Sequence, residues 1–329
     1  MAKPKRPGKA SLPVLVDASA GPSVVFRSSE AEVTTGFVDI PSSLSANESV
    51  PGSRVYFEDT GGDGRVLVFV YGLGCSIFHW KHQLPYLLRT GHRIIWFDYR
   101  GHGRSPALPP GTRLRLSTLE HDIAAVCLAL GVKVFTLMGQ SMGGSLALKF
   151  AHSYPQMVAG LVLLAAPPKP PSQTFKIGRI GTAAWRAAIA LNKTSPAVVR
   201  QGMSGIRRLM KPMAEVIRVL GFNPYLANTA DIEEYVEELL AVDPNLFWDL
   251  AADLEDLDLE KLTPDIACPT LVIAGARDQV VPLDHAVWLT KRLPAAEIEI
   301  VKHGSHCPHF DDPPLVNRRI EKFLKTHGL

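Results

Sequence analysis

The chain contains the stretch VFTLMGQSMGGSLALKFAHS at residues 134–153, and its middle decides how the rest can fold. Residues 134–138 are β-branched or apolar, and they predict a buried strand. The residues from Ser145 onward are rich in helix formers and predict a helix that starts at Ser141. A Gly-x-Ser-x-Gly pattern therefore lies where a strand turns into a helix. This context makes the pattern informative, because the five-residue pattern alone is a weak signal.

The turn around Ser141 suits a nucleophile. A strained turn would hold the hydroxyl where it projects from the sheet edge, and Gly139 and Gly143 lack side chains that would collide with neighbouring backbone. The free N–H groups and the positive dipole end of the helix would face the same point. The backbone N–H of Met142 is then a candidate donor to an oxyanion. The alternative is a Gly/Ser turn that leads into an ordinary packed helix.

Composition limits the class of protein. The 329 residues are 46% hydrophobic and 20% charged, which describes a globular protein of one large domain or two. A net charge of +3 makes no strong case for nucleic acid. No apolar run is long enough for a transmembrane segment, and no convincing signal peptide is present, so a cytoplasmic location is the default. The cysteines show no paired short spacing, which argues against a zinc ribbon or a disulfide scaffold and fits a reducing compartment: Cys75, Cys127, Cys268 and Cys307.

Strands and helices alternate along most of the chain. Residues 38–40 and 54–58 read as antiparallel edge strands, and the alternation after them predicts an α/β fold with a doubly wound, mostly parallel sheet. In such sheets, ligands bind at the carboxyl ends of the strands. The predicted strands are 66–70, 93–97, 134–138, 161–165, 270–274 and 298–301, and the predicted helices are 79–89, 117–130, 141–153, 283–292 and 314–326.

One long interval interrupts this alternation. A proline-rich run at its start forms a stiff boundary, and no strand signal follows until about Leu262. We therefore expect four parts: a partly disordered or loosely packed N-terminal tail over 1–36, a core over 37–166, an inserted helical cap over 167–262, and the second part of the core over 263–329. The first half of the insertion is basic and the second acidic, so its helices either present solvated faces or pack across a charged seam. Its predicted helical stretches are 180–191, 196–210, 213–220, 232–241 and 244–254.

A serine nucleophile needs a base, and the base needs a carboxylate to orient it. Asp278 is the candidate acid because it follows the predicted strand 270–274. Asp265 precedes that strand and so lies at the wrong end of the sheet. The alternative role for Asp278 is to cap the next helix, but Asp284 lies closer to that helix and suits the task better.

The candidate base follows the last predicted strand. Three histidines, His303, His306 and His309, are spaced three residues apart there. Helical zinc pairs need a different spacing, and no carboxylate lies between these histidines, so we expect no metal site. His306 follows a Gly-Ser turn from which its ring can face Ser141. His303 is expected at the strand end, and His309 is expected to pack beneath the loop.

The second oxyanion donor should come from the loop after the strand 66–70. That loop reads Tyr71-Gly72-Leu73-Gly74-Cys75, and its glycines let the backbone turn its N–H groups toward a substrate. The N–H of Leu73 is the candidate donor.

Together these segments resemble the α/β-hydrolase-fold family over roughly residues 55–326. The nucleophile, the acid and the base follow one another along the chain in the order that this layout requires. The family usually has His-Gly where this chain has Tyr71-Gly72. The histidine is thought to brace the loop, and Tyr71 keeps a hydrogen-bonding tip that could point into the pocket. The matching segments are the loop 71–74, the segment 98–105, the turn at Ser141, the acid loop at Asp278 and the loop with His306.

The resemblance and the serine nucleophile imply a serine hydrolase. Dehalogenases and epoxide hydrolases of this family need a carboxylate nucleophile, so the first hypothesis is cleavage of an ester, a lactone or a related acyl bond through an acyl-enzyme. Other pocket candidates are Gly72, Gln140 and Trp248, and the cap aromatics either line the pocket or form the core of the cap. We expect a small, hydrophobic acyl substrate, no cofactor and no nucleic acid, and the sequence predicts no oligomeric state.

Three alternatives remain open at this stage. A cofactor-free haloperoxidase or perhydrolase uses the same three side chains. A C–C bond hydrolase uses them too. A ligand-binding receptor on the same fold is an alternative of another class.

Overall fold

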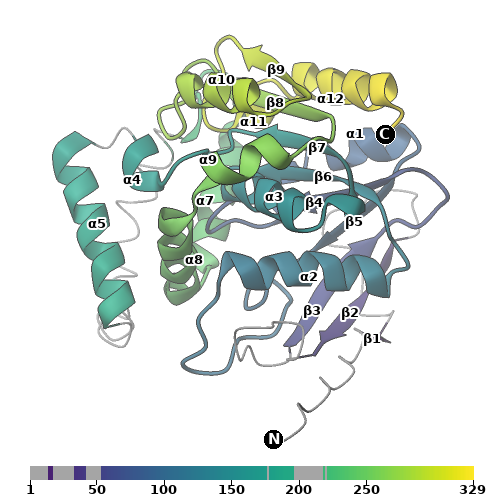
Figure 1. Ribbon diagram of the computed structural model, residues 1–329, viewed down its shortest axis with the longest axis horizontal. Helices are drawn as coiled ribbons and strands as arrows, with labels where there is room; N and C mark the ends of the chain where they lie inside the picture. The colour runs from purple at the N-terminus through teal and green to yellow at the C-terminus, as the bar shows by residue number, and fades with distance from the viewer. Residues whose placement is uncertain (1–13, 18–32, 42–52, 176–177, 196–217, 219–220) are drawn as a thin grey trace, which may run out of the picture.

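The computed structural model describes residues 14–17, 33–41, 53–175, 178–195, 218 and 221–329. Nine strands form one sheet in the order β1-β2-β3-β5-β4-β6-β7-β8-β9 (Figure 1). Strands β1 to β3 run antiparallel at one side and β3 pairs antiparallel with β5, whereas all pairs from β5 to β9 are parallel. This confirms the predicted mostly parallel α/β sheet. The strands are β1 (Val14–Asp17), β2 (Thr34–Ile40), β3 (Ser53–Asp59), β4 (Val66–Val70), β5 (Arg93–Phe97), β6 (Phe135–Gln140), β7 (Val158–Leu164), β8 (Thr270–Gly275) and β9 (Ala296–Val301).

Helices cover both faces of the sheet because its strands are apolar on both sides. On β4, Val68 and Val70 face the cluster that contains residues of α2, α3 and α10, while Leu67 and Phe69 face the cluster that contains residues of α1 and α12. The core helices are η2 (Ile77–Trp80), α1 (Leu84–Arg89), α2 (Leu116–Ala129), α3 (Met142–Ser153), η3 (Pro155–Met157), η4 (Thr263–Asp265), α10 (Leu283–Arg292), α11 (Pro308–Asp311) and α12 (Pro313–His327).

Several boundaries differ from the predictions. Strand β6 begins at Phe135 and ends at Gln140, so it runs up to the turn at Ser141, and Val134 is exposed. The helix predicted at 79–89 is wrong as a single element, because the structure has η2 and α1 in its place. Pro85 explains the break, since proline fits only the first turn of a helix, where its missing N–H needs no partner.

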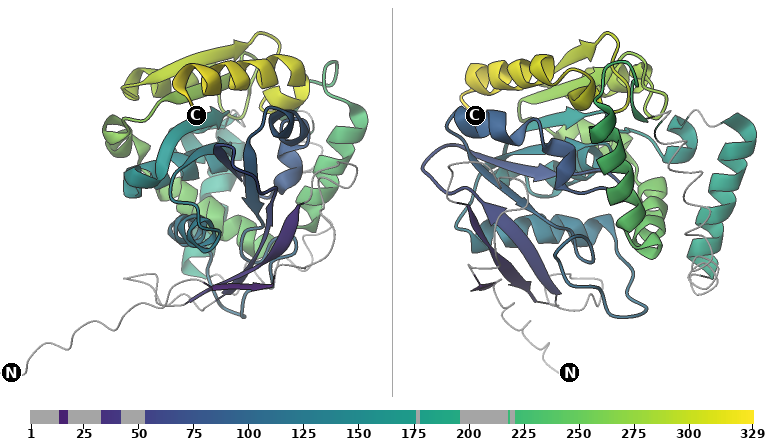
Figure 2. Two further views of the ribbon diagram at one scale, coloured as in Figure 1. Left: turned by 90° about the vertical axis from the view of Figure 1, so that its right-hand side faces the viewer. Right: turned by 180° about the vertical axis from the view of Figure 1, so that it is seen from behind.

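Between β7 and β8 the described residues form helices (Figure 1). Helices α7 and α8 lie close to the sheet, and α5 lies farther out, as Figure 2 also shows. The predicted stretches 196–210 and 213–220 lie outside the described residues, Arg218 excepted. Where the basic and acidic halves are both described, Lys193 of α5 pairs with Asp256 of α8. The helices are α4 (Pro171–Thr174), α5 (Gly178–Thr194), α7 (Thr229–Ala241), α8 (Pro244–Asp256) and α9 (Leu259–Leu262).

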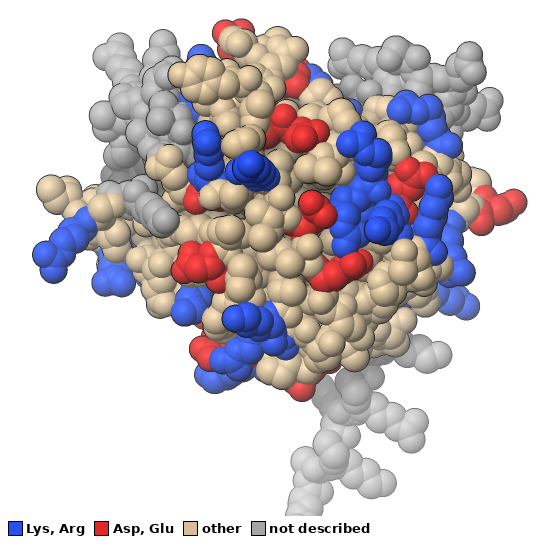
Figure 3. Space-filling model, turned by 90° about the horizontal axis from the view of Figure 1, so that it is seen from above, with Lys and Arg blue, Asp and Glu red and all other residues tan. Residues whose placement is uncertain are grey.

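The range 1–36, expected to be a tail, contains β1 and the first residues of β2. Its remaining residues lie outside the described residues, Val33 excepted. None of the helices in the described part of the chain is long and apolar enough to cross a membrane. The face shown in Figure 3 carries basic and acidic side chains side by side. On α12, for example, Arg319 pairs with Glu297 and Glu299 of β9.

Candidate active site

The turn between β6 and α3 holds Ser141 in a backbone conformation that residues other than glycine rarely adopt. Its φ is 53° and its ψ is −123°, and its N–H donates to the carbonyl of Leu164 at 2.8 Å. A Cβ atom on Gly139 would lie 2.3 Å from the carbonyl oxygen of Gly143. A Cβ atom on Gly143 would lie 2.7 Å from the carbonyl oxygen of Tyr71. Only glycine fits these two positions, so the spacing of the motif follows from the tightness of the turn.

Three side chains from distant parts of the chain meet at this turn. The Oγ atom of Ser141 lies 3.0 Å from Nε2 of His306, and Nδ1 of His306 lies 2.9 Å from Oδ2 of Asp278. His306 and Asp278 are both buried. With the proton on Nδ1 directed at the carboxylate, Nε2 is free to accept the proton of the serine hydroxyl.

The loop after β8 holds the carboxylate of Asp278. Its second oxygen, Oδ1, accepts the backbone N–H groups of Val280 and Val281, each at 2.8 Å. Both oxygens are thus bound, one by the histidine and one by backbone. The N-cap position of α10 is Pro282, with no side-chain cap, and Asp284 lies in the first turn. The expectation that Asp284 caps this helix is therefore wrong.

The loop after β9 is braced from both sides. Asp311 accepts the hydroxyl of Ser305 at 2.7 Å and the N–H of Asn223 at 3.1 Å, and burial raises the pKa of this carboxyl. The N–H of Cys307 donates to the carbonyl of Gly221 at 3.0 Å. His306 lies between these two anchors, so its ring is fixed through its neighbours.

The other two histidines of this loop have different surroundings. His303 is exposed, and His309 is fully buried. In the described parts of the chain, no group of three or more histidine, cysteine, aspartate or glutamate side chains could hold a metal ion. All four cysteines are free thiols.

The two backbone segments that carry the predicted oxyanion donors both lie next to Ser141. The N–H groups of Gly144 and Ser145 donate to the carbonyl of Ser141. The N–H groups of Met142 and Gly143 therefore come before the first hydrogen bonds of α3. A Cβ atom on Gly72 would lie 3.3 Å from Cβ of Ser141, which brings the loop of Leu73 against the nucleophile.

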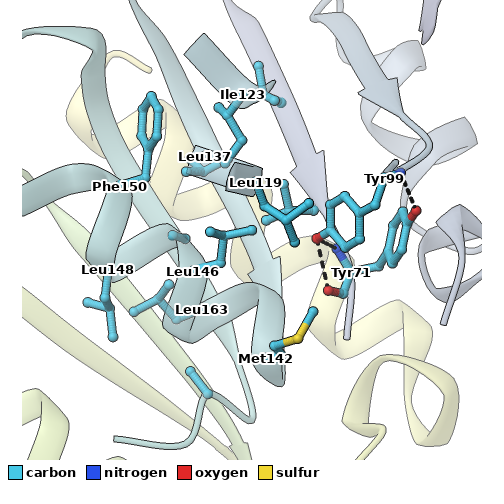
Figure 4. Packing of buried hydrophobic residues seen from close by; sticks show 14 of the residues in the cluster. Tyr71, Tyr99, Leu119, Ile123, Leu137, Met142, Leu146, Leu148, Phe150 and Leu163 are labelled. Carbon is cyan, nitrogen blue, oxygen red and sulfur yellow. Dashed lines mark hydrogen bonds between the residues drawn. The ribbon is translucent and has the colours of Figure 1, made fainter. Parts of the chain in front are cut away.

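Tyr71 does not point into a pocket, contrary to the expectation from sequence. It is fully buried, and its hydroxyl accepts the N–H of Tyr99 at 2.8 Å. The hydroxyl of Tyr99 in turn accepts the N–H of Tyr71 at 2.9 Å and donates to its carbonyl at 3.0 Å. The ring centroids are 4.1 Å apart, and Figure 4 shows each hydroxyl directed at the backbone of the other residue. Burial raises the pKa of both hydroxyls, so this neutral pair braces the loop.

Helices α7 and α8 lie directly against the same loop. A Cβ atom on Gly74 would lie 2.5 Å from Cδ1 of Leu239 on α7 and 3.0 Å from a ring carbon of Phe247 on α8. Trp248, a predicted pocket residue, packs against Trp185 and Phe247 in a cluster that also contacts Leu73. Three aromatic residues, Trp185, Phe247 and Trp248, thus pack in a small cluster that touches Leu73. Phe222 instead belongs to the main core, and Tyr225 is exposed.

Sequence reasoning missed His79. This histidine of η2 is buried and its Nδ1 lies 3.0 Å from Oε1 of Gln140, the residue before the nucleophile. Burial lowers the pKa of His79 to about 3, so it is neutral near pH 7. No motif spacing points to it, because it approaches Gln140 through the fold and not through the local sequence.

Comparison with known proteins shows which family the chain is part of. The family model described as alpha/beta hydrolase fold matches residues 65–313. The chain belongs to this family. It is 28% identical over 282 residues to a 2-hydroxy-6-oxononadienedioate/2-hydroxy-6-oxononatrienedioate hydrolase of Burkholderia vietnamiensis, a match that covers 83% of this chain and 91% of that protein.

Solved structures of the family share the fold. A thermophilic esterase from Thermogutta terrifontis superposes with a TM-score of 0.70 at 23% identity, covering 88% of this chain and 98% of that one. A hydrolase from Pseudomonas aeruginosa superposes with a TM-score of 0.68 at 26% identity, covering 83% and 95% of the two chains. These three proteins, which this α/β hydrolase resembles, are hydrolases, and the first two have names that indicate different substrates.

Proposed function

We propose that this α/β hydrolase is a serine hydrolase that cleaves a carboxylic ester, a lactone or a related acyl bond. The observation that carries the proposal is the chain of contacts from Ser141 through His306 to Asp278, with spacings of 3.0 and 2.9 Å. An uncharged hydroxyl is a weak nucleophile, and a buried imidazole held by a carboxylate is the group that activates it.

The reaction follows from these positions. His306 takes the proton of Ser141 through Nε2 while Oγ attacks the substrate carbonyl, and Asp278 stabilises the imidazolium that forms. The carbonyl oxygen becomes an anion that faces the N–H groups of Leu73 and Met142. His306 then returns the proton to the leaving alcohol, which leaves an acyl group on Ser141. Water repeats the same steps, loses its proton to His306 and releases the acid.

The domain arrangement supports a mostly apolar substrate. We propose that residues 37–166 and 263–329 form the catalytic core and that 167–262 form a cap over it. Leu239 and Phe247 of the cap reach the loop of Leu73, so this loop next to Ser141 has apolar walls. A small hydrophobic acyl compound fits such walls.

A fluorophosphonate probe tests the nucleophile, and a panel of nitrophenyl esters of graded acyl length together with lactones tests the bond. We expect labelling at Ser141 and turnover of at least one ester or lactone. Ligand binding without labelling would contradict the proposal and favour a receptor on this fold. Labelling with turnover of peracid or C–C substrates alone would keep the nucleophile and overturn the bond class.

A further inference from the structure

Two buried side chains next to Ser141 keep polar atoms without a partner among the described residues. Gln140 and His79 are each about 1% exposed and bond to each other through Oε1 and Nδ1 at 3.0 Å. The Nε2 atom of Gln140 and the Nε2 atom of His79 have no hydrogen-bond partner in the described part of the protein. Leaving a buried polar atom unpaired costs free energy, so such atoms in native proteins call for an explanation.

The unpaired atoms form a donor and an acceptor whichever way the two groups are oriented. His79 is neutral, because burial lowers its pKa to about 3. If its Nδ1 carries the proton, its Nε2 accepts and the amide of Gln140 still donates. If the amide is turned over, the amide oxygen accepts and Nε2 of His79 donates. Both arrangements leave one atom that donates and one atom that accepts.

The pair lies against the reaction centre. A Cβ atom on Gly72 would be 2.6 Å from Oε1 of Gln140 and 3.3 Å from Cβ of Ser141, so the glycine leaves the space in which the amide meets the oxyanion loop. The other side of His79 is closed by Tyr235 of α7, whose ring stacks on the imidazole at 4.6 Å and 7°. The pair is therefore enclosed by the core and by α7 together, and Gln140 is one residue away from Ser141.

We propose that Gln140 and His79 form a hydroxyl-binding subsite beside the nucleophile. A hydroxyl group can both donate and accept, so it can bond to either free atom in either orientation of the amide, whereas a carboxylate only accepts and an ammonium only donates. The hydroxyl belongs either to a substrate that carries it on the acyl part or to an ordered water. This inference rests on the proposed serine hydrolase function and narrows its substrate class.

The test uses pairs of nitrophenyl esters whose acyl chains carry either a hydroxyl or a methyl group on the same carbon, at the second, third or fourth position. If substrate supplies the hydroxyl, we expect kcat/KM to favour the hydroxyl member of one pair by about tenfold or more. Gln140→Leu and His79→Phe should each bring this ratio close to one. The matched control is Gln156→Leu, an exposed glutamine at the opposite end of the sheet, which should keep the wild-type ratio.

The second possible source of the hydroxyl is an ordered water, and a crystal structure of the wild-type enzyme at a resolution that shows waters tests for it. A water bonded to Nε2 of Gln140 or Nε2 of His79, together with a ratio near one for every ester pair, supports the subsite and assigns its hydroxyl to water. Two results overturn the proposal. One is a hydroxyl preference that both variants retain, and the other is a ratio near one with no oxygen bound to either nitrogen. The wild-type structure decides even if a variant fails to fold.

Labelling by a fluorophosphonate separates this inference from the proposed function. If wild-type enzyme is labelled at Ser141 and the ester pairs or the bound oxygen contradict the subsite, the subsite alone is wrong. If wild-type enzyme is not labelled, the serine hydrolase function fails first.

Discussion

The surroundings of two buried histidines next to the nucleophile turn differ in one respect. His306 bonds to Ser141 and to the carboxylate of Asp278, whereas His79 bonds to the neutral amide of Gln140. Burial lowers the pKa of His79 to about 3, because no anion is bonded to its ring to offset the loss of water. A fixed negative charge beside a buried imidazole stabilises the protonated form that a base passes through. The partner, and not the histidine, decides the role.

The largest expected effect is the loss of activity when Ser141, the partner of His306, is replaced. Ser141→Ala should lower kcat by about a millionfold, because it removes the group that His306 activates. Steady-state ester hydrolysis measures the loss, and circular dichroism confirms that the fold is kept. Substantial remaining activity would mean that another nucleophile, served by another base, is at work.

Asp278→Asn gives His306 the kind of neutral partner that His79 has. We expect kcat to fall by about ten thousandfold, because the amide favours the wrong tautomer and does not stabilise the imidazolium. The measurement is kcat against pH for the variant and the wild type. Full activity in this variant would place the orienting carboxylate elsewhere.

Gln140→Glu makes the opposite exchange and gives His79 a carboxylate. The pKa of His79 should rise by about two units or more, because an opposite charge within hydrogen-bond distance favours the protonated ring. A titration of the histidine ring signals by NMR measures it, with His79→Phe used to assign the signal. An unchanged pKa near 3 would show that burial outweighs the partner at this position.

The smallest expected effect concerns stability below neutral pH. The pKa of His79 in the folded protein is lowered from its ordinary value of 6.5 to about 3, so between these values the unfolded chain binds a proton that the folded protein does not. Stability from this group is therefore present above pH 6.5 and falls as the pH drops toward 3. His79→Phe should reduce the stability lost between pH 7 and pH 4.5 by about 2 kcal/mol.

Urea unfolding at the two pH values measures that difference. His303→Phe is the matched control, because it makes the same substitution at an exposed histidine. Equal pH dependence in wild-type protein and in His79→Phe would show that the buried ring does not resist protonation.

Much of this site was predictable because its signals are local. The Gly-x-Ser-x-Gly spacing follows from the close approach of backbone atoms to Gly139 and Gly143, which leaves no room for a side chain at either position. Asp278 and His306 could be selected because each follows a strand, and parallel strands end at one edge of the sheet. The structure places His306 within hydrogen-bond distance of both Asp278 and Ser141, and the catalytic roles of the three side chains remain predictions.

Other features could not be predicted because they depend on which surfaces meet. Tyr71 has the same chain position whether it faces a pocket or Tyr99, and packing against that second buried ring decides between them. The contact of Leu239 with Gly74 joins residues far apart in the chain and leaves no periodic pattern.

The amino-acid sequence by itself determined the parallel α/β sheet, the nucleophile turn and the order of the three side chains, because apolar periodicity and glycine requirements act over a few neighbouring residues. Only the tertiary structure decided that Tyr71 braces the loop after β4, that residues of α7 and α8 lie against this loop and that His79 lies beside Gln140. These are long-range contacts, and the low-dielectric interior that sets the pKa of His79 exists only once the chain has folded.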